Sequence, residues 1–237
     1  MIAFLLPEGD EFDALQQQLD ETGRCSIQPI LSEEAAAEVE GFLAASEEWC
    51  RIRGIGNQRF DLPPERERDP TPQVLEDHRA IDQAIASDSS KSFAFLYDAI
   101  PMTEAALTPA PDGLLAQLRR AMTDPAVFRW LERLTGEPAL TGVEIQATRF
   151  TTGDFLSLHH DGPNVDRKIA TVLGLSRDWS LDWGGNLLFP SVDDRLEGLS
   201  PGYNRLDLFM VPQFHSVTAV SPAALRPRLA VSGWFLG

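Results

Sequence analysis

Hydrophobic residues recur at helical spacing before residue 140 and at strand spacing after it. Phe12, Leu15 and Leu19 are spaced as neighbours on one helix face, which predicts an amphipathic helix. Ser32 precedes a run of acidic and alanine residues, and a serine side chain can cap the free amides at a helix start. We therefore expect a second helix after Ser32 and a helix-rich first half of the chain.

A third helix is predicted between Asp124 and Gly136. Aspartate suits the capping position, and Pro125 suits the first helical position because its missing N–H would be unpaired there. Gly136 is expected to end the helix. The apolar face consists of Val127, Trp130, Leu131 and Leu134. By contrast, residues 51–72 are rich in Arg, Pro, Gly and acidic residues, and we expect a loop there.

Short apolar segments with the period of a β-strand follow residue 140. Alternation at Val143, Ile145 and Ala147 predicts one strand. The further predicted strands are residues 169–175, 187–189, 206–211, 215–220 and 228–235. Gly, Pro, Asn and Asp separate these segments, which favours a jelly roll or barrel over alternating βαβ units.

These patterns predict a mainly β fold with supporting helices (α+β). We expect one domain over residues 1–237, with a helix-rich support region (1–140) packed outside a jelly-roll core (141–237). The oligomeric state stays open.

Composition and charge narrow the classes of function. The chain has 237 residues, 43% of them hydrophobic, which is enough for a sizeable core. Its net charge of −16 argues against a sequence-independent nucleic-acid binder, which needs a basic face, and against docking on an anionic membrane. No stretch approaches the roughly 20 apolar residues of a membrane span. Cys25 and Cys50 are too few for a disulfide framework, and we expect a cytoplasmic protein without a signal peptide.

The candidate chemistry begins at His159-His160-Asp161. Side chains i and i+2 of a strand share a face, so His159 and Asp161 can reach one metal while His160 points elsewhere. Pro163 and Asn164 follow closely and are expected to end the strand, which would put the pair at a barrel mouth. A lone His-x-Asp pair is more often an ordinary surface pair, so further observations must support the metal interpretation.

His215 supplies the third candidate ligand. It is the one other histidine in the strand-rich half, whereas His78 lies in an acidic helical segment and is expected on the surface. Two histidines and one carboxylate form the facial triad that holds non-haem Fe(II) and leaves open coordination positions. The sequence therefore predicts an iron site at His159, Asp161 and His215.

Arg228 follows His215 at a spacing that allows one return strand. On the alternation rule, Arg228, Ala230, Ser232 and Trp234 share one face, which leaves a slot beside the cation. An arginine fork bonds both oxygens of a carboxylate, so Arg228 is a candidate partner for a dicarboxylate. The simpler interpretation is an exposed strand arginine.

Several ordered motifs then resemble the Fe(II)/2-oxoglutarate dioxygenase superfamily, in its prolyl-hydroxylase-like branch. The motifs are Phe150-x-x-Gly153-x-x-Leu156-x-x-His159-x-Asp161, the strand from Arg167 to Leu173, Trp183-Gly184-Gly185-Asn186-Leu187, His215-Ser216-Val217, and Arg228-Leu-Ala-Val-Ser-Gly-Trp-Phe235. The last motif is similar to the corresponding segment of ribosomal prolyl hydroxylases. The resemblance covers roughly residues 143–236.

The resemblance implies a double-stranded β-helix core, Fe(II), 2-oxoglutarate and O2, with ascorbate as a candidate reductant. It implies iron ligation by the triad and binding of the distal 2-oxoglutarate carboxylate by Arg228. Phe150, Thr171 and Ser232 are further expected cosubstrate contacts. Two departures matter: Phe150 replaces a tyrosine that can bond 2-oxoglutarate, and Ala230 replaces a serine.

We therefore expect a dioxygenase that hydroxylates an unactivated C–H bond, most of all a prolyl or related residue in a protein or peptide. One alternative is a hydroxylase of a free amino acid or small metabolite, which an apolar lid from Phe93 to Pro101 would favour. An acidic rim at the barrel mouth would instead favour a basic protein substrate. The other alternative is a non-catalytic jelly-roll binding protein.

Overall fold

A computed structural model describes residues 2–88, 92–162, 166–191 and 195–237. The helices are α1 (Asp10–Thr22), α2 (Glu33–Ala45), α3 (Pro64–Arg68), α4 (Pro72–Asp88), α5 (Glu104–Leu107), α6 (Leu114–Met122), α7 (Pro125–Thr135) and the 3-10 turn η1 (Leu181–Trp183). None of the helices in the described ranges is both long and apolar enough to cross a bilayer.

The strands form a curled antiparallel sheet. They are β1 (Arg24–Ile27), β2 (Cys50–Ile55), β3 (Gln58–Leu62), β4 (Ala94–Pro101), β5 (Gly142–Phe150), β6 (Phe155–His159), β7 (Arg167–Leu175), β8 (Leu187–Pro190), β9 (Leu196–Leu199), β10 (Tyr203–Met210), β11 (His215–Val217) and β12 (Arg228–Leu236). Their order is β1-β10-β7-β12-β5-β4-β6-β11-β8-β9, and β2 joins β4 and β3 at the side. The expected jelly roll with supporting helices is confirmed.

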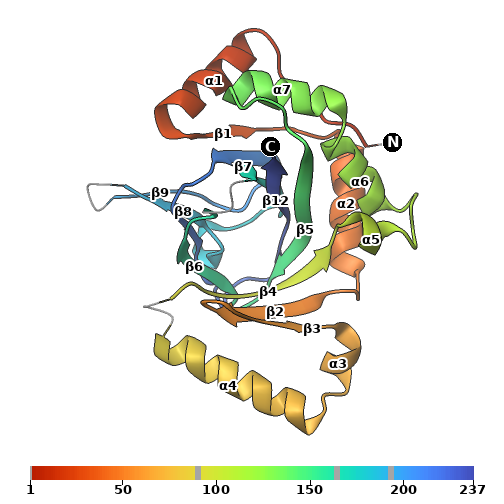
Figure 1. Ribbon diagram of the computed structural model, residues 1–237, viewed down its shortest axis with the longest axis vertical. Helices are drawn as coiled ribbons and strands as arrows, with labels where there is room; N and C mark the ends of the chain where they lie inside the picture. Colours follow the sequence, from red (N-terminus) through yellow and green to blue (C-terminus); the bar gives the residue numbers. More distant parts are fainter. Residues whose placement is uncertain (1, 89–91, 163–165, 192–194) are drawn as a thin grey trace.

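Two apolar layers follow from this arrangement. Figure 1 shows α1, α2, α6 and α7 covering one side of the curled sheet, while α4 lies beyond β2 and β3. A large core fills the space between those helices and the sheet, with Leu43, Leu118 and Phe235 fully buried or nearly so. A second, smaller cluster lies inside the curl and includes Phe150 and Phe209. The candidate site lies against this inner cluster.

The predicted helix ends are confirmed in atomic detail. The Ser32 hydroxyl accepts a hydrogen bond from the Ala35 amide, and the Asp124 carboxylate accepts one from the Ala126 amide. Gly136 ends α7 in the left-handed conformation, with φ of 73°, which a glycine adopts at little cost. These local signals place α2 and α7 before any tertiary contact is considered.

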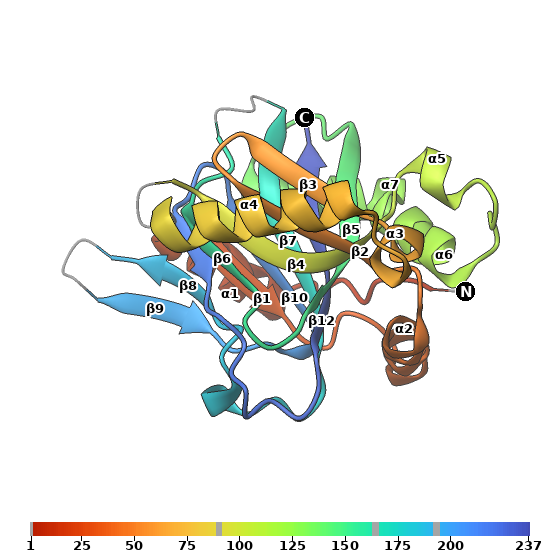
Figure 2. The same cartoon turned by 90° about the horizontal axis from the view of Figure 1, so that it is seen from below.

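The strand predictions after residue 140 correspond to β5, β7, β8, β10, β11 and β12, although β11 ends at Val217. The predicted loop at residues 51–72 is wrong. Most of β2, all of β3 and all of α3 lie there, and Figure 2 shows α4 lying across this hairpin.

The segment considered as a lid, Phe93 to Pro101, is mostly the central strand β4. It pairs with β2 along one edge, and with β5 and then β6 along the other. A strand held on both sides by backbone hydrogen bonds cannot open and close as a lid.

Candidate metal centre and cosubstrate pocket

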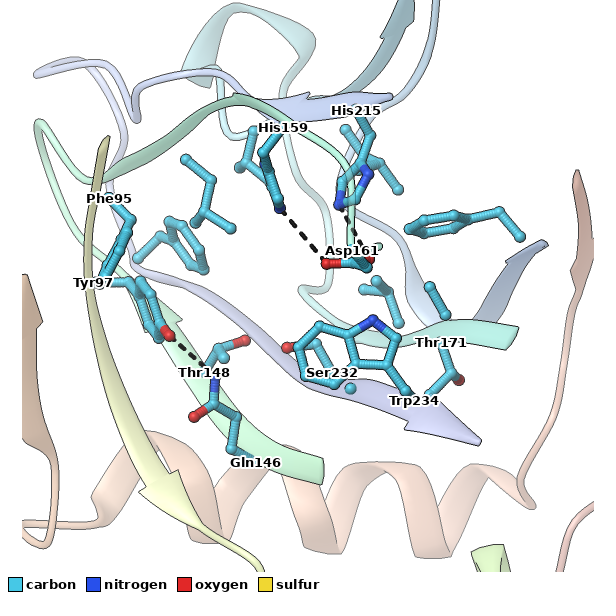
Figure 3. Close-up of a pocket in the computed structure, with 18 of the residues that line it drawn as sticks. Phe95, Tyr97, Gln146, Thr148, His159, Asp161, Thr171, His215, Ser232 and Trp234 are labelled. Carbon is cyan, nitrogen blue, oxygen red and sulfur yellow. Dashed lines mark hydrogen bonds and ion pairs between the residues drawn. The ribbon is translucent and has the colours of Figure 1, made fainter. Parts of the chain in front are cut away.

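Three potential metal ligands meet inside the curl. His159 ends β6, and His215 begins β11 directly opposite it in the antiparallel register. The Asp161 carboxylate lies 3.8 Å from His159 Nε2 and 3.7 Å from His215 Nε2 (Figure 3). One ligand atom from each residue lies within 4.8 Å of the other two. Two imidazoles and one carboxylate that converge from one side, as in a facial triad, suit Fe(II) and leave its other coordination positions open.

Backbone carbonyls orient both imidazole rings. His159 Nδ1 lies 2.9 Å from the Ser157 carbonyl oxygen, and His215 Nδ1 lies 2.9 Å from the Gln213 carbonyl oxygen. A proton on each Nδ1 is donated to its carbonyl, so each Nε2 keeps a lone pair directed at Asp161. This is the usual outer support of a metal-binding histidine.

Burial prepares His159 for a metal. Its removal from water, and secondarily the neighbouring His215, lower the pKa of His159 to about 4. The ring is therefore neutral near pH 7, and a neutral imidazole is the form that binds a metal.

His160 lies on the opposite face from the triad. It is exposed, and its ring packs edge-on against Phe214 with centroids 4.9 Å apart. The alternation of a strand explains this separation from His159. Pro163 and Asn164, expected to end the strand, lie outside the described residues.

A cavity of about 260 Å³ opens beside the triad. Its walls are largely aromatic and apolar, and the ring of Phe93 stacks on His159 with centroids 4.1 Å apart. The polar and charged side chains that line it, besides the triad, belong to Arg59, Tyr97, Gln146, Thr148, Arg167, Thr171, Arg228, Ser232 and Trp234.

Arg228 is buried in this cavity, and no described residue forms a salt bridge with it. It is 5% exposed, and its Nε has no hydrogen-bond partner among the described residues. The guanidinium carbon lies 4.9 Å from the centre of the Phe150 ring, which offers no charge. Burial lowers the pKa of Arg228 to about 10, although Asp207 acts in the opposite direction. Such a cation is costly until an anion joins it.

The other expected cosubstrate contacts divide between two faces. Phe150 is directly opposite Arg228 in the β5–β12 register, and Ser232 lies in the cavity wall near Thr148 (Figure 3). Thr171 also lines the cavity, but it shares a strand face with Ile169 and Leu173, which belong to the core under the helices, and its hydroxyl points away from the triad. A cosubstrate contact through the Thr171 hydroxyl therefore stays a prediction without geometric support.

Tyr97 and Gln146 are cavity residues that the sequence patterns did not indicate. The Tyr97 ring stacks on Phe150 with centroids 5.5 Å apart, and its hydroxyl accepts a hydrogen bond from Gln146 Nε2 at 3.1 Å. Alternation along β5 could have placed Gln146 on the same face as Phe150. Tyr97 gave no such signal, because its strand was considered as a lid.

A comparison with known families finds a match in the C-terminal part of the chain. The family model described as the 2OG-Fe(II) oxygenase superfamily matches residues 145–236, which include the whole triad and Arg228. These residues are thus similar to the 2OG-Fe(II) oxygenase superfamily. The cofactor and cosubstrates of that superfamily are Fe(II), 2-oxoglutarate and O2, and both the triad and the unpaired Arg228 fit them.

Two curated proteins that are similar to the chain are named prolyl 3-hydroxylases. The chain is 32% identical to "Prolyl 3-hydroxylase OGFOD1" of Mus musculus over 132 residues, or 52% of this chain and 24% of the relative. It is 33% identical to the Xenopus laevis protein of the same name over 117 residues, or 46% of this chain and 22% of the relative. The chain thus matches about a quarter of the length of these relatives.

Solved structures show the same fold. A Pseudomonas putida prolyl-4-hydroxylase aligns with a TM-score of 0.58 and 17% identity, covering 99% of this chain and 94% of its own. A Trichoplax adhaerens prolyl hydroxylase, solved with a peptide fragment of hypoxia inducible factor, aligns with a TM-score of 0.58 and 16% identity. That alignment covers 95% of this chain and 89% of the other. At these identities the likeness concerns the fold.

Proposed function

We propose that the chain is an Fe(II)- and 2-oxoglutarate-dependent dioxygenase that hydroxylates an unactivated C–H bond. His159, Asp161 and His215 would hold the iron through two Nε2 atoms and one carboxylate. The bound metal with its cosubstrates would supply the oxidising chemistry that side chains cannot. The observation that carries the proposal is the buried, unpaired Arg228 in the same cavity as the triad.

Arg228 would bind the distal carboxylate of 2-oxoglutarate. Its planar fork can donate two parallel hydrogen bonds, and the low-polarity surroundings strengthen a charge pair. Phe150 stacks beside the guanidinium but has no hydroxyl to donate, so Arg228 carries more of this contact than in a relative with tyrosine there. Ser232, on the same strand, is a nearby candidate donor.

We propose a prolyl or related residue of a protein or peptide as the substrate. Both curated relatives and two of the structural neighbours carry prolyl hydroxylase in their names, and the Trichoplax enzyme was solved with a peptide. The apolar wall formed by Phe93 suits a proline ring. Hydroxylation of a small metabolite and a non-catalytic role are less well supported.

Two coarser features complete the proposal. Residues 1–237 would act as one domain, because β4 from the first half pairs with both β5 and β6 from the second. A cytoplasmic location would suit Cys25 and Cys50, which are both unpaired.

Succinate production tests the proposal. The native chain is incubated with Fe(II), ascorbate, O2 and 2-oxoglutarate, alone and with proline-containing peptides or free amino acids, beside a His215→Ala variant. Succinate formed by the native chain and stimulated by peptides is expected. Stimulation by free amino acids alone would replace the peptide substrate with a small molecule. Iron binding without succinate under any condition would reject the proposed reaction.

A further inference from the structure

We propose that Arg59, on β3, and Arg167, on β7, form a second anion-binding region along the wall of the cavity, which selects a peptide with an acidic residue beside the target proline. The inference rests on the proposed function, since it assigns the neighbours of the reacting residue. Of the aspartates and glutamates among the described residues, only Asp161 lines the cavity, and iron would occupy it. The remaining charged side chains of the lining are Arg59, Arg167 and Arg228.

Arg167 is held rigidly with one donor group spare. Its guanidinium carbon lies 3.4 Å from the centre of the Trp234 ring, and its Nε and Nη2 donate to Glu144. Its Nη1 has no partner among the described residues. An arginine that is already ordered loses little conformational freedom when it binds another carboxylate.

Arg59 likewise has only some of its N–H donors in hydrogen bonds with described residues. Its Nε donates to Asp61 at 2.7 Å, which leaves both Nη groups without a partner in the part of the chain that the structure describes. Arg59 and the Tyr97 hydroxyl lie within electrostatic range of each other. Gln146, which donates to that hydroxyl, adds a further polar group to the same wall.

The two acidic partners do not remove this preference. Asp61 and Glu144 have side chains 49% and 51% exposed, and such pairs contribute little because water screens them. Neither residue lines the cavity, whereas both arginines do. An incoming carboxylate therefore meets N–H donors first.

The chain's net charge of −16 does not contradict an acidic ligand in this region. Exposed charges are screened over about 8 Å at physiological ionic strength, so the groups along the cavity wall decide local affinity. The acidic rim that would have favoured a basic substrate is not what lines this cavity. An acidic neighbour of the target proline fits better.

Peptide binding without turnover tests the inference. Three fluorescent peptides carry one proline flanked on both sides by glutamate, glutamine or lysine. Their Kd values are measured by anisotropy with Mn(II) and 2-oxoglutarate bound, so the result does not depend on hydroxylation. We expect the glutamate peptide to bind about fivefold more tightly than the glutamine peptide, and the lysine peptide more weakly still.

Variants assign the preference to the two arginines. Arg59→Gln and Arg167→Gln should each remove most of the glutamate preference, Arg59→Lys should keep it, and Arg59→Glu should reverse it. Arg133→Gln is the matched control. Arg133 is an exposed arginine on α7, away from the cavity, and it pairs with Glu8. The 2-oxoglutarate Kd should not change in Arg59→Gln, which shows that the pocket is intact.

Equal Kd values for the glutamate and lysine peptides would overturn the inference. A glutamate preference that survives both glutamine variants would also overturn it, and so would the absence of binding by any of the three peptides. Succinate formation with another peptide would leave the proposed function standing in each of these cases. Conversely, a glutamate preference without succinate would retain the anion-binding region and reject the reaction.

Discussion

His215 lies directly opposite His159 across the β6–β11 pair, and their ring centroids are 4.2 Å apart. The two residues are far apart in sequence, so only the antiparallel register brings their Nε2 atoms to one carboxylate. Each ring is also held by the carbonyl two residues before it. The geometry of the metal centre is thus determined mainly by backbone pairing.

Replacing His215 by alanine should abolish tight iron binding and turnover. The remaining His159 and Asp161 would offer only two protein ligands, and iron bound that weakly would exchange with solvent. Iron content after dialysis and succinate formation measure the effect. Activity equal to that of the native chain would remove His215 from the ligand set.

The matched control is His160→Ala. His160 is exposed and contacts Phe214 on the face away from the triad, so its loss should leave iron content unchanged. Loss of iron in this variant, with His159→Ala retaining it, would show that the register at the metal is shifted by one residue.

Replacing Arg228 by methionine should weaken the binding of 2-oxoglutarate without destabilising the fold. The Kd for 2-oxoglutarate should rise by about a hundredfold, since a buried charged hydrogen bond contributes about 2–3 kcal/mol. The free energy of unfolding of the unliganded protein should not fall, because the variant removes a buried cation with which no described residue forms a salt bridge and keeps much of the volume. Calorimetric titration and urea denaturation measure the two quantities. Parallel loss of stability and binding would make Arg228 a structural residue.

Asp154→Asn should destabilise the fold strongly. The Asp154 carboxylate is fully buried, pairs with Arg51, and accepts hydrogen bonds from the amide and hydroxyl of Thr151. Removing its charge leaves the Arg51 guanidinium buried with less compensation, which costs about 3 kcal/mol in the free energy of unfolding. Urea denaturation measures it. Glu8→Gln breaks an exposed pair and should cost less than about 1 kcal/mol; equal losses would contradict this ranking.

The two cysteines should resist thiol reagents near pH 8. Burial, and then Asp207, raise the pKa of Cys25 to about 12, while burial and Asp61 raise that of Cys50 to about 11. The thiolate is the reactive form, so labelling should be slow in the native protein and fast in urea.

The same shifts predict an alkaline loss of stability. Above pH 9.0, the ordinary thiol value, the unfolded chain loses thiol protons that folded Cys25 retains, so the free energy of unfolding falls as the pH rises. A Cys25→Ser variant should show a shallower fall between pH 8 and 10 than the native chain. An identical slope in both would rule out this thiol as the cause.

Local chemistry explains what could be predicted from the sequence. The caps at Ser32 and Asp124 act over two or three residues, so their effect is visible without tertiary structure. The alternation rule likewise separated His159 from His160. Arg228 could be proposed because it shares a strand face with small residues.

Charge pairs between residues that lie far apart in the sequence explain why some strands could not be predicted. β2 was mistaken for a loop because Arg51 and Arg53 alternate with its apolar residues. Their partners are Asp154 and Asp82, which lie far away in sequence, and no local pattern indicates those pairings. The contribution of Arg59 to the cavity was missed because β3, which carries it, lies in the segment predicted as a loop.

The position of β4 has a consequence for how the chain can be divided. The matched superfamily segment begins at residue 145, yet β4 ends at Pro101 and pairs with both β5 and β6. Excising the matched segment would strip a central strand from the sheet and leave two unsatisfied edges, which are templates for self-association. We therefore expect the smallest autonomous folding unit to include the N-terminal strands, so that the boundaries of sequence similarity are not the boundaries of the folded domain.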